Sequence, residues 1–209
     1  MRVGSLRDDV FLLAHDDAGR MVVSEPVIGA GLAGATLIDL LLQGRVAVSQ
    51  GRLDVIDSAL TGDEESDTTL SAIAANTAPT GPRAWVSWIS HGAYARAADH
   101  LEAAGVIQRS SARRFGLLPT ARCTPVQPED LVRVRSRIRF ALHARELPEP
   151  ETAALCGLVR VLRLEGALLL SMPTSDLLLG LERLTAANDL TIRQVTNAVE
   201  TVITAATYR

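Results

Sequence analysis

The chain has 209 residues, of which 47% are hydrophobic, so length and composition predict a folded domain with a sizeable core rather than a disordered chain. Its formal net charge is −3 and only 3% of its residues are aromatic, which argues against a surface built to bind nucleic acid. All 21 basic residues are arginines, which excludes a lysine Schiff base and a P-loop lysine.

Cysteine spacing and hydropathy indicate whether the protein is secreted, membrane-spanning or soluble. Cys123 and Cys156 have no C-x-x-C spacing, which is typical of a reduced intracellular protein. Acids interrupt the N-terminus before a signal-peptide core, and Asp39 interrupts the longest apolar run, which falls short of the roughly 18–20 residues of a spanning helix. We therefore expect a soluble or peripheral protein with no cofactor, no metal and no catalytic residues.

The first third of the chain predicts helices separated by short strands. Ser5 and Asp8 resemble a capping box at the start of the first helix. His15-Asp16-Asp17 could hold a metal but is more typical of a hydrogen-bonded turn. The expected elements are a helix over Ser5–Ala14, a strand over Met21–Val23, a helix from Gly29–Gly34 to Gln43, a hairpin of Arg45–Ser49 and Leu53–Ile56, an acidic loop over Thr61–Asp67 and a helix over Leu70–Asn76.

The remainder is predicted to be helical apart from one strand–turn–strand unit that begins at Val106. The expected helices are Ala84–Ala104 with Trp85, Trp88, Ile89 and Leu101 in the core, Glu129–Ala144, Glu151–Leu164, Ala167–Met172 continuing past Pro173 into Asp176–Ala187, and Thr191–Tyr208 with Thr191 and Gln194 as a capping box. We therefore predict a mainly α fold over residues 1–209. It is a single-domain helical bundle with small β-hairpins, one of which protrudes and is basic and apolar.

Gly29, Gly31 and Gly34 spell the G-x-G-x-x-G fingerprint of dinucleotide-binding folds. A dinucleotide fold needs a buried strand before the first glycine and an acid after the second strand. Pro26 interrupts that strand here, and the second strand ends in Ser49. The sequence therefore favours glycines that pack a helix, and a dinucleotide-binding enzyme remains the alternative.

A basic segment stands out in this acidic chain. Residues 108–145 contain nine arginines and only two acids. The conventional interpretation is a solvated helix whose arginines pair with acids elsewhere. The functional interpretation is a surface for an anionic membrane, with Arg96, Arg133 and Arg137 as supporting cations.

The turn of the strand–turn–strand unit combines basic and apolar residues. Basic and apolar side chains together on an exposed loop suit a membrane interface, where arginines meet phosphates and apolar groups enter the acyl boundary. Alternatively, the apolar residues pack the hairpin onto the core. The candidate lipid-binding residues are Arg113, Arg114, Phe115, Leu117 and Leu118.

A third interpretation concerns the helix that precedes this hairpin. A helix followed by a basic hairpin resembles the end of a winged-helix DNA-binding domain. Asp99 and Glu102 on that helix are unfavourable near a DNA duplex. A winged-helix regulator is therefore kept as a second alternative.

Several segments in order resemble the Golgi phosphoprotein 3 family of peripheral membrane proteins, in a bacterial, actinomycete-like form. Leu6–Leu13 resembles the family's L-x-x-E-x-x-L-L helix, and Gly31–Val46 resembles its G-L-R-G-x-x-L-I-E-L segment with the later G-R-L. Leu101–Ile107 resembles L-x-x-K-G-V-L before a hairpin, and Pro150–Leu164 resembles the R-x-x-A-L-x-x-L helix.

The resemblance implies a mostly helical domain that recognises phosphatidylinositol 4-phosphate at a membrane and, in eukaryotic members, retains Golgi glycosyltransferases by their cytoplasmic tails. Phe115, Leu117 and Leu118 fall at the family's membrane-inserting positions. The family's headgroup pocket falls at Ser24, Ala33, His91 and Tyr94, none of them an arginine. The implied partners are an anionic phospholipid surface at the inner face of the membrane, a membrane-protein client and a second copy of the chain, with no nucleic acid.

Overall fold

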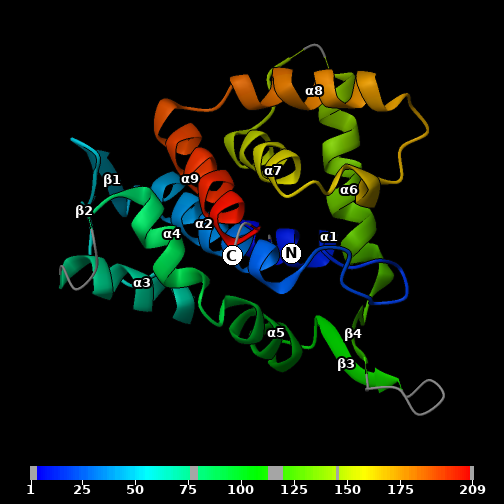
Figure 1. Ribbon diagram of the computed structural model, residues 1–209, viewed down its shortest axis with the longest axis horizontal. Helices are drawn as coiled ribbons and strands as arrows, with labels where there is room; N and C mark the ends of the chain where they lie inside the picture. Colours follow the sequence, from blue (N-terminus) through cyan, green and yellow to red (C-terminus); the bar gives the residue numbers. More distant parts are fainter. Residues whose placement is uncertain (1–3, 76–79, 113–119, 145, 208–209) are drawn as a thin grey trace.

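The computed structural model describes residues 4–75, 80–112, 120–144 and 146–207. It confirms a mainly α fold with two small antiparallel hairpins (Figure 1). The helices are α1 (Leu6–Leu13), α2 (Glu25–Leu42), α3 (Glu64–Ala74), α4 (Pro82–Ser90), α5 (Ala93–Ala103), α6 (Pro128–His143), α7 (Pro150–Val161), the 3₁₀ helix η1 (Glu165–Leu168), α8 (Thr174–Ala186) and α9 (Leu190–Thr207). The strands are β1 (Val46–Ser49), β2 (Arg52–Val55), β3 (Ile107–Ala112) and β4 (Thr120–Pro125).

Helix α2 lies at the centre, and α1, α4, α5, α7 and α9 pack around it (Figure 1). It is long and apolar enough, by length and composition alone, to cross a membrane, but two thirds of it is buried inside the protein. Its apolar residues are largely enclosed by the surrounding helices. We therefore interpret α2 as the core helix of the fold.

The three fingerprint glycines lie inside α2, where they let neighbouring elements approach closely. A Cβ on Gly31 would lie 2.6 Å from a methyl group of Leu162, and one on Gly34 would lie 2.3 Å from a methyl group of Val199. A Cβ on Gly29 would lie 3.0 Å from the carbonyl oxygen of Ser90. The packing interpretation is confirmed, and the dinucleotide interpretation is wrong, because no glycine-rich loop precedes the helix for a pyrophosphate to contact.

The segment between α1 and α2 differs from the sequence prediction in two ways: α2 begins at Glu25, before the glycines, and no strand forms over Met21–Val23. Ser24 is the N-cap of α2 and Pro26 lies in its first turn, a position that tolerates proline because the first N–H groups have no intrahelical partner. The predicted strand over Met21–Val23 is wrong, since only Met21 forms an isolated bridge, with His15. The short apolar run of Met21–Val23 thus does not form a strand, because the packing of α2 determines the structure of this segment.

The start of α1 is fixed both by its own sequence and by α2. The predicted capping box is confirmed, because the Ser5 hydroxyl accepts from the Asp8 N–H at 3.1 Å and the Asp8 carboxylate accepts from the Ser5 N–H. The Asp39 carboxylate of α2 accepts from the Leu6 N–H at 3.1 Å and also from the Arg7 N–H. Burial raises the pKa of Asp39 to about 7 despite these bonds.

The hairpin of β1 and β2 forms as predicted, whereas the acidic segment after it differs from the predicted loop. Gln50 and Gly51 both have positive φ, which suits a two-residue hairpin turn. The segment over Thr61–Asp67 is only partly a loop, because Asp63 caps α3 and accepts from the Ser66 N–H at 2.9 Å. Acids in the first turn favour this helix start through the helix dipole.

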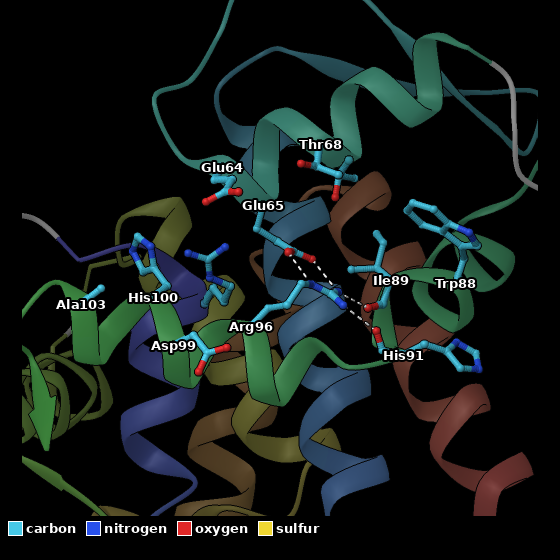
Figure 2. A pocket seen from close by; sticks show the side chains of 12 residues that line it. Glu64, Glu65, Thr68, Trp88, Ile89, His91, Arg96, Asp99, His100 and Ala103 are labelled. Carbon is cyan, nitrogen blue, oxygen red and sulfur yellow. Dashed lines mark hydrogen bonds and ion pairs between the residues drawn. The ribbon is translucent and has the colours of Figure 1, made fainter. Parts of the chain in front are cut away.

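The long helix predicted over Ala84–Ala104 is two helices. The chain breaks at His91 and Gly92, where Gly92 adopts a φ of +70° that suits glycine. Trp85 is buried as predicted, whereas Trp88 is 45% exposed, so its placement in the core was wrong. α5 begins after the break, and Trp88 of α4 lies at the surface and lines a pocket together with residues of α3 (Figure 2).

The last three helices form largely as predicted, with two corrections. The segment over Ala167–Met172 is not an α-helix, since η1 ends at Leu168 and Leu169 adopts a φ of +50°. At the start of α9 the cap is Asp189 rather than Thr191, because the Asp189 carboxylate accepts from the Thr191 N–H at 2.7 Å. Val195 and Val199 of α9 are fully buried.

Candidate functional site

Strands β3 and β4 form the hairpin that the sequence assigns to membrane binding. Their register runs from Ile107 opposite Pro125 to Ala112 opposite Thr120, and the pair lies at the edge of the molecule, beyond α5 and α6 (Figure 1). The candidate residues Arg113, Arg114, Phe115, Leu117 and Leu118 lie outside the described residues, in the RRFGLLP segment that joins the two strands. The described part of the hairpin is thus peripheral, with its root, at Ile107 and Pro125, next to the body of the protein.

The base of this hairpin is held to the body of the protein. Ile107 and Cys123 are buried at its root. Arg109 of β3 forms an ion pair with Asp99 at 2.7 Å, and its Nε donates to Glu102 at 2.7 Å, both on α5. Arg109 is therefore paired with two acids of α5.

The supporting arginines do not form one free basic face. Arg137 on α6 donates to the buried carboxylate of Asp9 on α1 at 2.6 Å, and Arg133 pairs with Asp130 within α6 at 3.3 Å. Arg96 lies apart from them, on α5. Burial raises the pKa of Asp9, and the Arg137 guanidinium opposes that rise. The structure thus shows Arg137 in a structural ion pair, and Arg133 as the more exposed of these two α6 arginines.

Arg96 lines a pocket of about 740 Å³ between α3, α4 and α5 (Figure 2). Its Nε donates to Glu65 at 2.7 Å, and its terminal nitrogens donate to Glu65 and to the carbonyl oxygens of Ile89 and His91. Arg96 thereby satisfies carbonyl groups at the end of α4. A lipid phosphate could contact Arg96 only at the expense of these bonds.

The rest of this pocket is acidic and partly aromatic. Glu64 is exposed on its α3 side, and Trp88 contributes an exposed indole from α4 (Figure 2). Arg7 also lines the pocket; it is buried and donates two hydrogen bonds to the Asp63 carboxylate, at 2.7 and 3.1 Å. The paired arginines and the free carboxylate make this hollow a poor anion site and a better surface for a cationic group.

A buried polar chain runs behind the hairpin. The Nδ1 of His15 lies 2.8 Å from the Phe11 carbonyl oxygen and therefore carries the proton, so the Nε2 accepts from the Tyr94 hydroxyl at 3.1 Å. The Tyr94 oxygen lies 3.5 Å from the Cys123 sulfur. Burial lowers the pKa of His15 and raises the pKa of Tyr94, so both groups stay neutral and act as packing and hydrogen-bonding residues.

The predicted turn after α1 is confirmed. The Asp16 carboxylate accepts from the backbone N–H groups of Ala18 and Arg20, each at 2.9 Å, and from the Arg20 side chain at 2.8 Å. These bonds lower the pKa of Asp16. Among the described residues no cluster of three His, Cys, Asp or Glu side chains is arranged to hold a metal ion.

The four positions that the resemblance assigns to the family's headgroup pocket differ in how deeply they are buried. Ala33 is fully buried inside α2, and the Tyr94 hydroxyl is engaged by His15. Ser24 starts α2, and His91 is exposed at the end of α4. The family's arginine contacts are therefore not reproduced at these four places.

A cleft of about 520 Å³ does open next to two of these positions, between the start of α2, α4 and the end of α9. Glu25, His91 and Arg83 line it. Sequence reasoning missed Arg83, whose only signal is its place directly after Pro82 in the first turn of a helix. Arg83 is the basic residue that this cleft offers to an anionic group.

Comparison with known proteins now identifies the family. No curated protein matches the chain. A model of the family described as Golgi phosphoprotein 3 (GPP34) matches residues 6–206, nearly the whole sequence. The matched range includes all of the segments that resemble the family in the sequence, from α1 to α7. The chain therefore belongs to the Golgi phosphoprotein 3 (GPP34) family.

Proposed function

We propose that this protein is a non-enzymatic peripheral membrane protein that binds anionic lipid through the turn of the β3–β4 hairpin. The observation that supports the proposal is the peripheral position of β3 and β4, the two strands that flank the RRFGLLP segment in the sequence. Two arginines beside apolar residues match the phosphate layer and the acyl boundary of a bilayer. The proposed location is the cytoplasmic, inner face of a membrane.

The family suggests phosphatidylinositol 4-phosphate as the lipid. The four headgroup positions carry no guanidinium, and the nearby cleft offers Arg83 instead. We therefore propose general attraction to anionic lipid, and treat preference for phosphatidylinositol 4-phosphate as the narrower form of the proposal. Vesicles matched in total charge, with and without this lipid, distinguish the two forms.

An adaptor role for membrane proteins extends the same proposal. The pocket between α3, α4 and α5 presents Glu64 and Trp88 to solvent, and this combination suits a cationic segment of a client. A client bound there would lie beside α5, the helix that holds the hairpin base. Self-association into a homo-oligomer stays a prediction of the sequence.

Co-sedimentation with vesicles tests the hairpin directly. Wild type is expected to sediment with vesicles that contain anionic lipid and to remain in solution with phosphatidylcholine alone. A variant with Arg114→Ala, Phe115→Ala and Leu117→Ala should lose most of this binding. The matched control is Arg193→Ala, which removes one arginine from α9, far from the hairpin turn in sequence. Equal binding by wild type and the hairpin variant would contradict the proposal.

A further inference from the structure

A second, smaller cavity of about 290 Å³ lies between the loop that follows α1 and the η1 segment. Two arginines line it, Arg135 from α6 and Arg163 from the end of α7. Its apolar lining includes Val22 from the loop and Leu169 after η1, which are 49% and 62% exposed. The cavity therefore combines guanidinium groups with apolar side chains that solvent reaches.

The acids of this cavity leave positive charge uncompensated. Asp16 is committed to Arg20 and to its own turn, as described above. Asp17 lies 3.0 Å from Arg135, but its side chain is 69% exposed whereas that of Arg135 is only 13% exposed. Among the described residues no acid lies within ion-pair distance of Arg163. Within the described residues the Arg163 guanidinium thus has no paired acid. The Asp17 carboxylate that pairs with Arg135 is exposed and can move away into solvent.

Arg135 is also fixed in place. Its Nε donates to the Ala167 carbonyl oxygen of η1 at 2.7 Å, which orients the remaining nitrogens toward Asp17 and the cavity. A guanidinium held in this way loses little side-chain freedom when it binds a phosphate. Arg135 is therefore held in position to contact an anion. Its terminal nitrogen is occupied by the Asp17 carboxylate, which an anion can displace.

Two residues that line the cavity have left-handed backbone angles. Arg163 and Leu169 have φ of +58° and +50°, a region that non-glycine residues rarely adopt. Within the described chain, the remaining non-glycine residue with positive φ is Gln50, in a hairpin turn where it is expected. Both angles belong to helix ends: Arg163 follows the C-cap of α7, where the Leu164 N–H donates to the Val159 carbonyl oxygen at 2.9 Å, and Leu169 is the C-cap of η1. These two helix ends bring Arg163 and the exposed Leu169 into the lining of one cavity.

The cavity is connected to the proposed membrane hairpin. The Cys123 N–H of β4 donates to the Gly19 carbonyl oxygen at 2.9 Å, in the loop that carries Val22. A Cβ on Gly19 would lie 2.9 Å from the Cys123 backbone, so the loop lies directly against the strand. Figure 1 shows this loop, η1 and the hairpin on the same side of the molecule. The loop that lines the cavity is therefore in direct contact with the hairpin that we propose to bind the membrane.

We propose that this cavity binds the phosphate of an anionic phospholipid. Arg135 and Arg163 hold the phosphate oxygens, Asp17 leaves Arg135 when the lipid enters, and Val22 and Leu169 contact the apolar part of the lipid. This inference rests on the proposed membrane function. It adds a lipid site that is separate from both the hairpin turn and the family's headgroup positions.

Vesicle binding by three charge variants tests the site. Arg163→Gln should weaken binding to phosphatidylglycerol vesicles about fivefold, whereas the control Arg160→Gln, an exposed arginine one turn earlier on α7, should change it little. Asp17→Asn should strengthen binding, because it removes the carboxylate that competes for Arg135. Equal loss for the two arginine variants, or weaker binding by Asp17→Asn, would overturn the proposal.

Two further results separate the possible failures. If wild type fails to bind anionic vesicles, both the membrane function and the lipid site are wrong. If the hairpin variant loses binding but Arg163→Gln and Arg160→Gln behave alike, the membrane function stands and the cavity assignment falls. Inorganic phosphate tests the other source of this anion. If phosphate raises the melting temperature of wild type but not of Arg163→Gln, and this variant binds vesicles as well as wild type does, the cavity binds free phosphate instead.

Discussion

Replacing Asp39 by asparagine should remove a specific pH dependence from the stability of the fold. The Asp39 carboxylate is buried in α2, where it accepts from the first backbone N–H groups of α1. Burial raises its pKa from 3.8 to about 7. The native state therefore binds this proton more tightly than the unfolded chain does, and the free energy of unfolding falls as the pH rises between these two values.

The expected size follows from the shift. About three pKa units at roughly 1.36 kcal/mol each give a loss of about 4 kcal/mol from this group across the window. Asp39→Asn stays neutral throughout and keeps one acceptor oxygen for α1. The difference in unfolding free energy between variant and wild type should therefore move in favour of the variant by about 4 kcal/mol from pH 4 to pH 7.5.

Urea unfolding at a series of pH values measures this difference, and the contributions of other acids cancel in it. Asp39→Ala is the matched control, because it also lacks the titration but leaves the Leu6 and Arg7 N–H groups without their acceptor. It should lie below Asp39→Asn at every pH by about 1–3 kcal/mol. Parallel curves for wild type and Asp39→Asn would refute the account of this carboxyl group.

Three further substitutions or treatments test the packing and the ion pairs. Gly34→Ala places a Cβ 2.3 Å from a Val199 methyl group and should cost about 1–3 kcal/mol in urea unfolding, with part of the loss recovered by adding Val199→Ala; additive losses would contradict the contact. Arg137→Ala leaves the Asp9 carboxylate buried without its cation and should cost about 3 kcal/mol, less when Asp9→Asn is present; an unchanged cost in the double variant would argue against the pair. Burial raises the pKa of Cys156 to about 12, so iodoacetamide at pH 8 should leave it unmodified in the native protein and modify it after unfolding, as read by mass spectrometry; rapid native labelling would be inconsistent with the buried thiol.

The local parts of the fold were predictable because their causes lie close together in the sequence. The Ser5 and Asp8 capping box and the Gln50-Gly51 turn need only neighbouring residues, and both form as expected. The break at Gly92 was missed because a single glycine within an apolar helical pattern does not by itself require positive φ. The exposure of Trp88 was missed as well, because the sequence pattern does not show which face of α4 packs against the core.

The candidate site was less predictable because its charges pair across the fold. The sequence shows the arginines but not that Arg96 is held by Glu65, or that Arg137 is held by Asp9, 128 residues away. The cavity at Arg135 and Arg163 likewise depends on how α6 meets η1. What the sequence did identify was the hairpin itself, because alternating strands around a basic and apolar turn form a local pattern.

A fluorophore on the hairpin turn tests the membrane account most directly. Leu117→Cys can carry an environment-sensitive probe, since the native Cys123 and Cys156 are buried, and Thr201→Cys on the exposed side of α9 provides the control. The account predicts a blue-shifted, brighter emission from the hairpin probe with anionic vesicles, little change with phosphatidylcholine alone, and no change at the control site. Unchanged emission from the hairpin probe while the protein co-sediments with anionic vesicles would contradict the central claim.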